Sequence, residues 1–206
     1  MSGLGFLFVH PGASAVLALT LAFSVGGLLW WPGLIERCVL RPYWLVRRGQ
    51  WHTLLSSGLV HADFGHLLLN MLTFWFFAFP LERAIGTTRF LLLYLLALVV
   101  SDVNTWLKHR REPEYGSLGA SGAIAAVLFA SIVYFPNQSL FIIPIPVPIP
   151  APLFAVGYVA YSWYSARQAR GRINHDAHFA GALAGLAFVA LVHPQAYDRI
   201  LSMLAP

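Results

Sequence analysis

The sequence predicts an all-α polytopic membrane protein, folded as a bundle of six transmembrane helices. Of its 206 residues, 58% are hydrophobic and only 10% are charged, a balance too apolar for a soluble domain of this size. Apolar runs of membrane-spanning length alternate with short segments that hold nearly all of the charge. The runs lie at about 13–35, 62–80, 89–107, 119–135, 151–166 and 177–193. Because no repeat or long linker divides the chain, residues 1–206 are predicted to form a single six-span domain.

The first apolar run is expected to remain in the mature protein. No Lys or Arg precedes it, since the first basic residue is Arg37, and it is longer than the apolar region of a signal peptide. Residues 36–60 then mix Trp and Tyr with Arg, which is typical of a segment lying at the membrane interface. The net charge of +5 therefore favours lipid headgroups, and not nucleic acid, as the partner of the basic residues.

Three of the predicted spans carry a polar residue near their start and a proline 14 to 16 residues later: His66 and Pro80, Ser121 and Pro136, and His178 and Pro194. Each proline is expected to end its helix. At about 1.5 Å per residue these intervals come to about 21–24 Å, which is less than a hydrocarbon core of about 30 Å. Since the second, fourth and sixth spans run in the same direction, the three polar residues are predicted to lie at one depth, below one membrane surface.

The segment "IPIPVPIPAP", residues 143–152, has a proline at every second position. Such a segment cannot be helical, because each proline lacks the backbone N–H that a helix needs. We predict an extended apolar connector between the fourth and fifth spans.

Polar groups within membrane spans are costly, so a group of them is a candidate functional site. In "HLLLN", His66 and Asn70 lie four residues apart on one helix face, and both can donate hydrogen bonds. In "GASG", Ser121 lies at a helix N-terminus, where unpaired backbone N–H groups can meet a developing negative charge. In "HDAHFAGALAG", His178 lies near the start of the last span.

Small residues favour close packing of the fourth and sixth spans. Gly181 and Gly185 lie one turn apart, and Gly122 and Ala126 repeat that spacing, while Gly119 precedes the serine. If these spans face each other, His178 comes within reach of Ser121. The set then comprises a serine nucleophile, a histidine base and oxyanion donors from His66, Asn70 and the Ser121 N–H, which is the chemistry of acyl transfer. Asp176 would point away from His178, so the prediction is a two-member dyad.

Four segments, taken in order, resemble the rhomboid family of intramembrane serine proteases: "WHTLLSSGLVHADFGHLLLN", "LERAIG", "GASG" and "AHFAGALAG". The resemblance covers about residues 50–190, and it implies a protease core at about 50–195. It implies a rhomboid-like six-span fold and hydrolysis of a peptide bond in or beside the transmembrane helix of a single-span membrane protein substrate, without metal or cofactor. It also implies that Ser121 is the nucleophile, that His178 is the general base, and that His66 and Asn70 bind the oxyanion.

The resemblance extends to a structural acid and includes one departure. Glu82 in "LERAIG" matches a structural acidic position at the end of the second span. Many members have an aromatic residue four positions after the serine, stacked on the catalytic histidine, whereas this chain has Ala125.

Two other functions are compatible with parts of the sequence. A membrane metal site or transport pathway could be formed by the histidines and aspartates near two span starts: His61, Asp63, His66, His175, Asp176 and His178. That alternative lacks an H-E-x-x-H motif and leaves "GASG" without a role. A catalytically inactive relative that only binds transmembrane clients would normally lack the serine or the histidine, and both are present here.

The predicted location is an integral, multi-pass position in the bacterial plasma membrane. The loops on the site's side carry ten basic residues, whereas the opposite side carries Arg83, Arg89 and Arg199. The positive-inside rule then predicts that the site faces the cytoplasm. The family resemblance implies the opposite orientation, because bacterial rhomboids generally open the site to the exterior.

Overall fold

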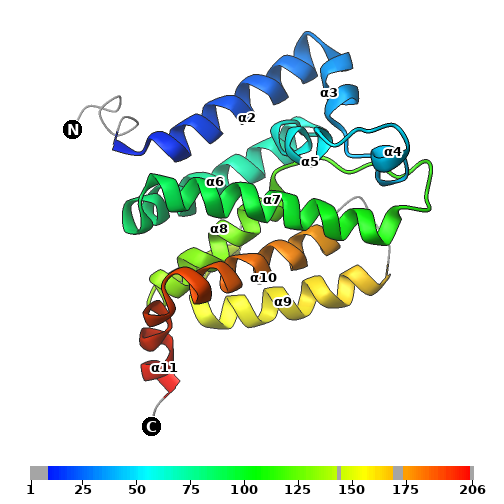
Figure 1. Cartoon of the computed structure of the whole chain (residues 1–206). Helices are drawn as coiled ribbons and strands as arrows, with labels where there is room; N and C mark the ends of the chain where they lie inside the picture. The colour runs from blue at the N-terminus through cyan, green and yellow to red at the C-terminus, as the bar shows by residue number, and fades with distance from the viewer. Residues whose placement is uncertain (1–8, 143–144, 169–173, 205–206) are drawn as a thin grey trace.

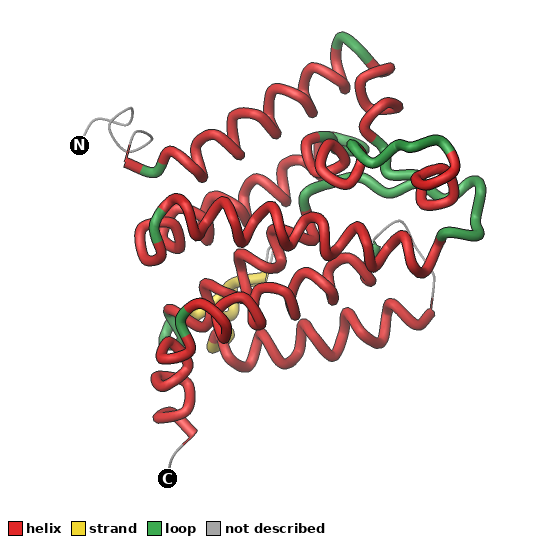
Figure 2. The backbone as a smooth tube through the Cα atoms, viewed as in Figure 1, coloured by secondary structure: helices red, strands yellow, loops and turns green. Residues whose placement is uncertain are grey.

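The computed structural model describes residues 9–142, 145–168 and 174–204. These residues form a bundle of helices with one small hairpin (Figures 1 and 2). The long helices are α2 (Pro11–Leu29), α6 (Phe64–Ile85), α7 (Thr87–His109), α8 (Ser121–Tyr134), α9 (Ala151–Gln168) and α10 (His175–Val192). Each predicted apolar run thus contains a helix, and the predicted all-α, polytopic membrane fold is confirmed.

The central helix of the bundle is α8. All of its residues from Gly122 to Val133 are buried, and it packs on α6, α7 and α10. Among the described helices, α2, α6, α7 and α10 are long and apolar enough to cross a membrane, and α8 is an apolar helix of only 14 residues. The count of six spans therefore stays a prediction.

Short elements cover one end of the bundle. They are α3 (Pro32–Cys38), α4 (Pro42–Arg47), α5 (Thr53–Ser56) and the 3-10 turn η1 (Ser57–Leu59). Figure 1 shows α3 directly after the end of α2, and α4 and α5 contact α7. Leu40 pairs with Ser117, which ties this segment to the loop before α8. The segment is thus folded as short helices against the bundle end, and its position at the membrane interface stays a prediction.

The proline-rich segment is extended, as predicted, over residues 145–150. The prediction is wrong for Ala151 and Pro152, which begin α9, because proline is tolerated in the first turn of a helix. Strand β2 (Ile145–Pro150) pairs antiparallel with β1 (Ser139–Ile142), with Leu140 opposite Ile149. Residues 143 and 144 lie outside the described residues. The hairpin leads directly into α9, and the chain ends in the turn η2 (Pro194–Tyr197) and α11 (Asp198–Leu204).

The prediction that Pro80 ends the second span is wrong. Helix α6 passes through Pro80 and ends at Ile85. Proline removes a single backbone donor, and the turn beyond it is held by contacts of Glu82. The other two prolines follow helix ends as predicted, because α8 ends at Tyr134 and α10 ends at Val192.

The Glu82 carboxylate holds the start of α2 against the end of α6. It is 2% exposed and accepts hydrogen bonds from the backbone N–H groups of Gly12 (2.9 Å) and Ala13 (2.7 Å). It also accepts the Thr87 hydroxyl at 2.6 Å. Backbone N–H groups at a helix start have no partner within the helix, so this carboxylate completes the first turn of α2.

We expect Glu82→Ala to lower the free energy of unfolding by about 2–5 kcal/mol, because three donors would lose their acceptor at a buried position. Chemical unfolding of the detergent-solubilised protein measures the change. Glu36→Ala is the matched control, since Glu36 is exposed and its ion pair with Arg41 is expected to contribute less than about 1 kcal/mol. Equal losses in the two variants would contradict the capping role.

Candidate active site

The three polar residues predicted to form a site lie at helix starts. His66 is the third residue of α6, Ser121 is the first residue of α8, and His178 is the fourth residue of α10. All three side chains are half-buried. Each of them lies within the first four residues of its helix, and their common depth in the membrane stays a prediction.

Gly119 brings the turn before Ser121 against the His66 ring. Its φ of +113° lies in the region that favours glycine. A Cβ added here would lie 2.6 Å from His66 Cε1, so there is also no space for a side chain. The Gly119 N–H donates to the Ser57 carbonyl at 2.9 Å, and the Ser57 hydroxyl donates to the buried Asp102 at 2.6 Å. This hydrogen-bonded chain fixes the serine turn to α7.

The backbones of α8 and α10 are in contact. A Cβ on Gly181 would lie 2.7 Å from the Gly122 carbonyl carbon, and one on Gly185 would lie 2.8 Å from Ala126 Cα. At the same level, a Cβ on Gly122 would lie 3.2 Å from the Ala177 carbonyl oxygen. Gly122 follows Ser121 and Ala177 precedes His178, so the predicted small-residue contact brings these two parts of the chain together. Among the described residues, no hydrogen bond joins the Ser121 hydroxyl to the His178 ring.

Asn70 has a free donor beside this site. The residue is 8% exposed, and its amide nitrogen is buried with no hydrogen-bond partner among the described residues. It lies one turn after His66 on α6, as the sequence spacing requires. A buried amide donor without an acceptor is uncommon in folded proteins.

Tyr158 places an aromatic ring near His178, although position 125 holds an alanine. Ala125 is buried within α8 and offers no ring. The Tyr158 ring, from α9, lies 6.4 Å from the His178 ring with an interplanar angle of 23°. His175 adds an edge-on contact at 6.0 Å. His178 is therefore flanked by rings from α9 and from its own helix.

The start of α10 is anchored to α7 and to the loop before α8. Asn174 accepts the Ala177 N–H at 3.0 Å, and its amide donates to Thr105 at 2.9 Å and to Ser117 at 3.0 Å. Asp176 pairs with Lys108 at 2.6 Å. The Asp176 carboxylate is thus engaged by α7.

His61 connects α2 to the His66 ring. The Ser24 hydroxyl donates its one hydrogen to the Leu59 carbonyl at 2.9 Å, so the His61 Nδ1–H donates to Ser24 Oγ at 2.9 Å. The His61 and His66 rings meet edge to face, with their centres 4.8 Å apart. Burial, and to a lesser extent the neighbouring His66, lower the pKa of His61 to about 3, against an opposing effect of Asp63. The ring is neutral at neutral pH.

The described residues do not assemble the alternative metal site. In residues 9–142, 145–168 and 174–204, no three His, Cys, Asp or Glu side chains lie close enough to hold a metal ion. Asp176 is paired with Lys108.

Comparisons with known proteins identify the family. A family model of the Rhomboid domain matches residues 48–195. The chain is 34% identical to the rhomboid protein YdcA of Bacillus subtilis over 144 residues, which are 65% of this chain and 68% of YdcA. It is 33% identical over 147 residues to the human mitochondrial presenilin-associated rhomboid-like protein, covering 68% of this chain and 38% of that protein. It is 34% identical over 99 residues to the rhomboid protease GluP of Bacillus subtilis, covering 48% of this chain and 19% of GluP.

The fold is that of a polytopic integral membrane protein, and the family that the comparisons identify supports an intramembrane protease-like function. The chain belongs to the rhomboid family.

Proposed function

We propose that this chain is an intramembrane serine endopeptidase that cleaves the transmembrane segments of single-span membrane proteins. Ser121 Oγ attacks the carbonyl carbon of the scissile bond while His178 accepts the hydroxyl proton. His66, Asn70 and the Ser121 N–H stabilise the oxyanion. The intermediate then releases the amine, which takes the proton from His178. Water hydrolyses the remaining ester, again with His178 as the base.

The observation that carries this proposal is the backbone contact between α8 and α10. Since Gly122 and Gly181 leave no room for a side chain between the helices, the starts of α8 and α10 must lie side by side. Ser121 and His178 are on those starts. Small residues alone would explain the packing, but they would not explain a half-buried serine and a half-buried histidine beside it.

The free amide of Asn70 supports the oxyanion part of the proposal. An oxyanion forms only during the reaction, so its donors have no acceptor in the resting protein. The buried Asn70 side-chain nitrogen likewise has no acceptor among the described residues. His66 lies on the same face and contacts the turn that leads into Ser121.

The proposal extends to the whole chain. Residues 1–206 form one six-span domain, with the protease core at about 50–195, in the bacterial plasma membrane. The bacterial relatives YdcA and GluP support this location, whereas other rhomboid relatives are mitochondrial. Catalysis is assigned to side chains and backbone groups of this chain, with no metal or cofactor.

A fluorophosphonate probe tests the nucleophile, because it reacts covalently with an activated serine. We expect the detergent-solubilised wild type to be labelled, with unchanged labelling after treatment with a chelator, and Ser121→Ala to be unlabelled. Ser131→Ala is the matched control, since Ser131 lies on the same helix but is fully enclosed in the bundle. Labelling of the Ser121→Ala protein would reject the proposed dyad. Loss of wild-type labelling after treatment with the chelator would also reject it.

A further inference from the structure

An apolar groove of about 530 Å³ lies between α8, α9 and α10. Its walls include Val156, Ala160 and Trp163 from α9, Phe129 from α8, and Phe179 and Leu186 from α10. The residues from α9 are spaced by three or four positions, so they form one stripe along that helix. A groove of this composition fits a hydrocarbon chain.

A cation lies at one end of the groove. Arg167 is one turn beyond Trp163 on the same stripe, and its guanidinium carbon lies 3.7 Å above the centre of the Trp163 ring. In the part of the chain that the structure describes, no carboxylate pairs with Arg167. The nearby acid of α10, Asp176, is paired with Lys108, whose ammonium group also donates to the Ala166 carbonyl at 2.6 Å.

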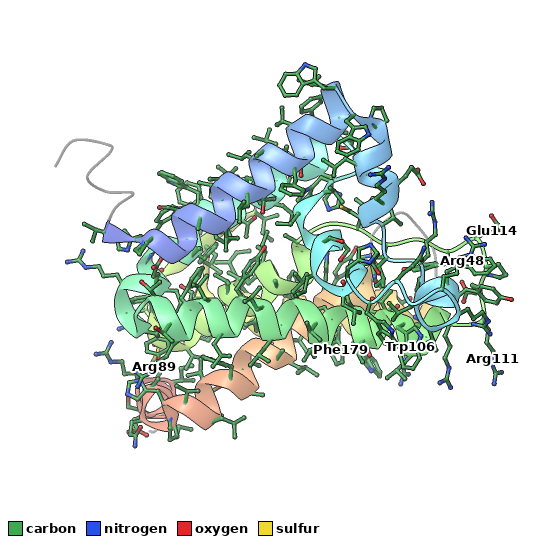
Figure 3. The ribbon with its side chains drawn as sticks, turned by 45° about the horizontal axis from the view of Figure 1, so that its top comes forward. Arg48, Arg89, Trp106, Arg111, Glu114 and Phe179 are labelled. Carbon is green, nitrogen blue, oxygen red and sulfur yellow. The ribbon has the colours of Figure 1, made fainter. Side chains whose placement is uncertain are left out.

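Other Arg–aromatic pairs mark the same end of the molecule as the headgroup level. They are Arg37 with Trp31, Arg47 with Tyr43, Arg48 with Trp44, and Arg110 with Trp106. Figure 3 shows Arg48, Trp106 and Arg111 at this end, and Arg89 at the opposite end. Arg and Trp concentrate where the membrane meets water. The groove therefore begins at the headgroups and runs into the hydrocarbon layer.

We propose that this groove is a binding site for an anionic phospholipid, with one acyl chain between α9 and α10 and the phosphate on Arg167. The α9 stripe from Ala155 to Arg167 is about 18 Å long at about 1.5 Å per residue, which suits a chain that starts at a headgroup. The planar guanidinium can bind phosphate oxygens at its edge while its face stays on Trp163. Phe179 in the groove wall is adjacent to His178 in the chain, so the lipid lies beside the candidate active site. This lipid site does not depend on the proposed hydrolysis of peptide bonds by Ser121.

Native mass spectrometry of the full-length, detergent-solubilised protein tests the site. The protein is mixed with equal amounts of phosphatidylglycerol and phosphatidylcholine that carry the same acyl chains. We expect the wild type to retain phosphatidylglycerol about fivefold better, which is the effect of one basic residue near an anionic surface. Arg167→Gln is expected to bring the ratio to about one. Ala160→Phe, which fills the groove, is expected to lower retention of both lipids.

Arg110→Gln is the matched control. Arg110 stacks on Trp106 four residues before it, at the same end of the molecule, but these residues do not line the groove. If Arg110→Gln and Arg167→Gln lost the preference for phosphatidylglycerol equally, the proposal would be overturned. The total positive charge at this end of the molecule would then explain lipid binding. Unchanged retention in a folded Ala160→Phe protein would also overturn it.

Photo-crosslinking of the wild type needs no folded variant. A phosphatidylglycerol with a diazirine on its acyl chain is expected to label peptides of α9 and α10 that line the groove. Labelling confined to other helices would reject the site. Displacement of the lipid from these peptides by a synthetic single-span peptide would instead assign the groove to a protein helix.

Discussion

Protein carrying His178→Ala is expected to cleave a model transmembrane substrate about 100- to 10,000-fold more slowly than the wild type, which is the usual contribution of a general base. The serine hydroxyl is a weak nucleophile unless a base takes its proton. This expectation depends on the proposed function. Gel-based cleavage of a purified single-span substrate in detergent measures the rate.

His193→Ala is the control for this experiment. His193 follows the last residue of the same helix, at the other end from His178, and its ring hydrogen-bonds the Tyr134 hydroxyl at 3.0 Å. We expect it to retain the wild-type rate. A second variant, Tyr158→Phe, keeps a ring beside His178 and should retain most of the activity. If His178→Ala cleaved at the control rate, His178 would not be the base.

The helix starts that carry the candidate site could be predicted from the sequence because local rules determine them. "GASG" combines a glycine that permits a positive φ with small residues at a helix start, and α8 begins at Ser121. The i, i+4 spacing of His66 and Asn70 places both on one face of any helix. The repeated small-residue spacing predicts which helices approach closely, and the Gly181 backbone does lie against Gly122.

Contacts between distant segments could not be predicted in the same way. Tyr158 lies beside His178 only because α9 packs against α10, and no spacing within the sequence shows this. Asp102 lies late in an apolar run, and it is buried and accepts the Ser57 hydroxyl. Each partner belongs to a different element, so only the folded chain reveals the pair.

Pro80 shows how a local rule can fail within a folded bundle. Proline disfavours a helix interior because its nitrogen has no hydrogen to donate. The helix nevertheless continues to Ile85, where Glu82 binds the start of α2 and the Thr87 hydroxyl. The tertiary contacts of the last turn thus outweigh one missing hydrogen bond. The position of Pro80 therefore does not predict where α6 ends.

Gly181→Ala is expected to destabilise the protein by about 1–3 kcal/mol or more, the usual cost of inserting a methyl group where there is no space. The new Cβ would lie 2.7 Å from the Gly122 carbonyl carbon, and a backbone neighbour cannot turn aside as a flexible side chain can. Helix α10 would therefore have to move away from α8. His178 lies one turn before Gly181 and would move with it, so cleavage should fall together with the thermal unfolding midpoint.

Gly157→Ala on α9 is the control, because nothing lies within 4 Å of its added Cβ and alanine favours a helix. Equal midpoints for the two variants would contradict the backbone contact on which the proposed dyad depends.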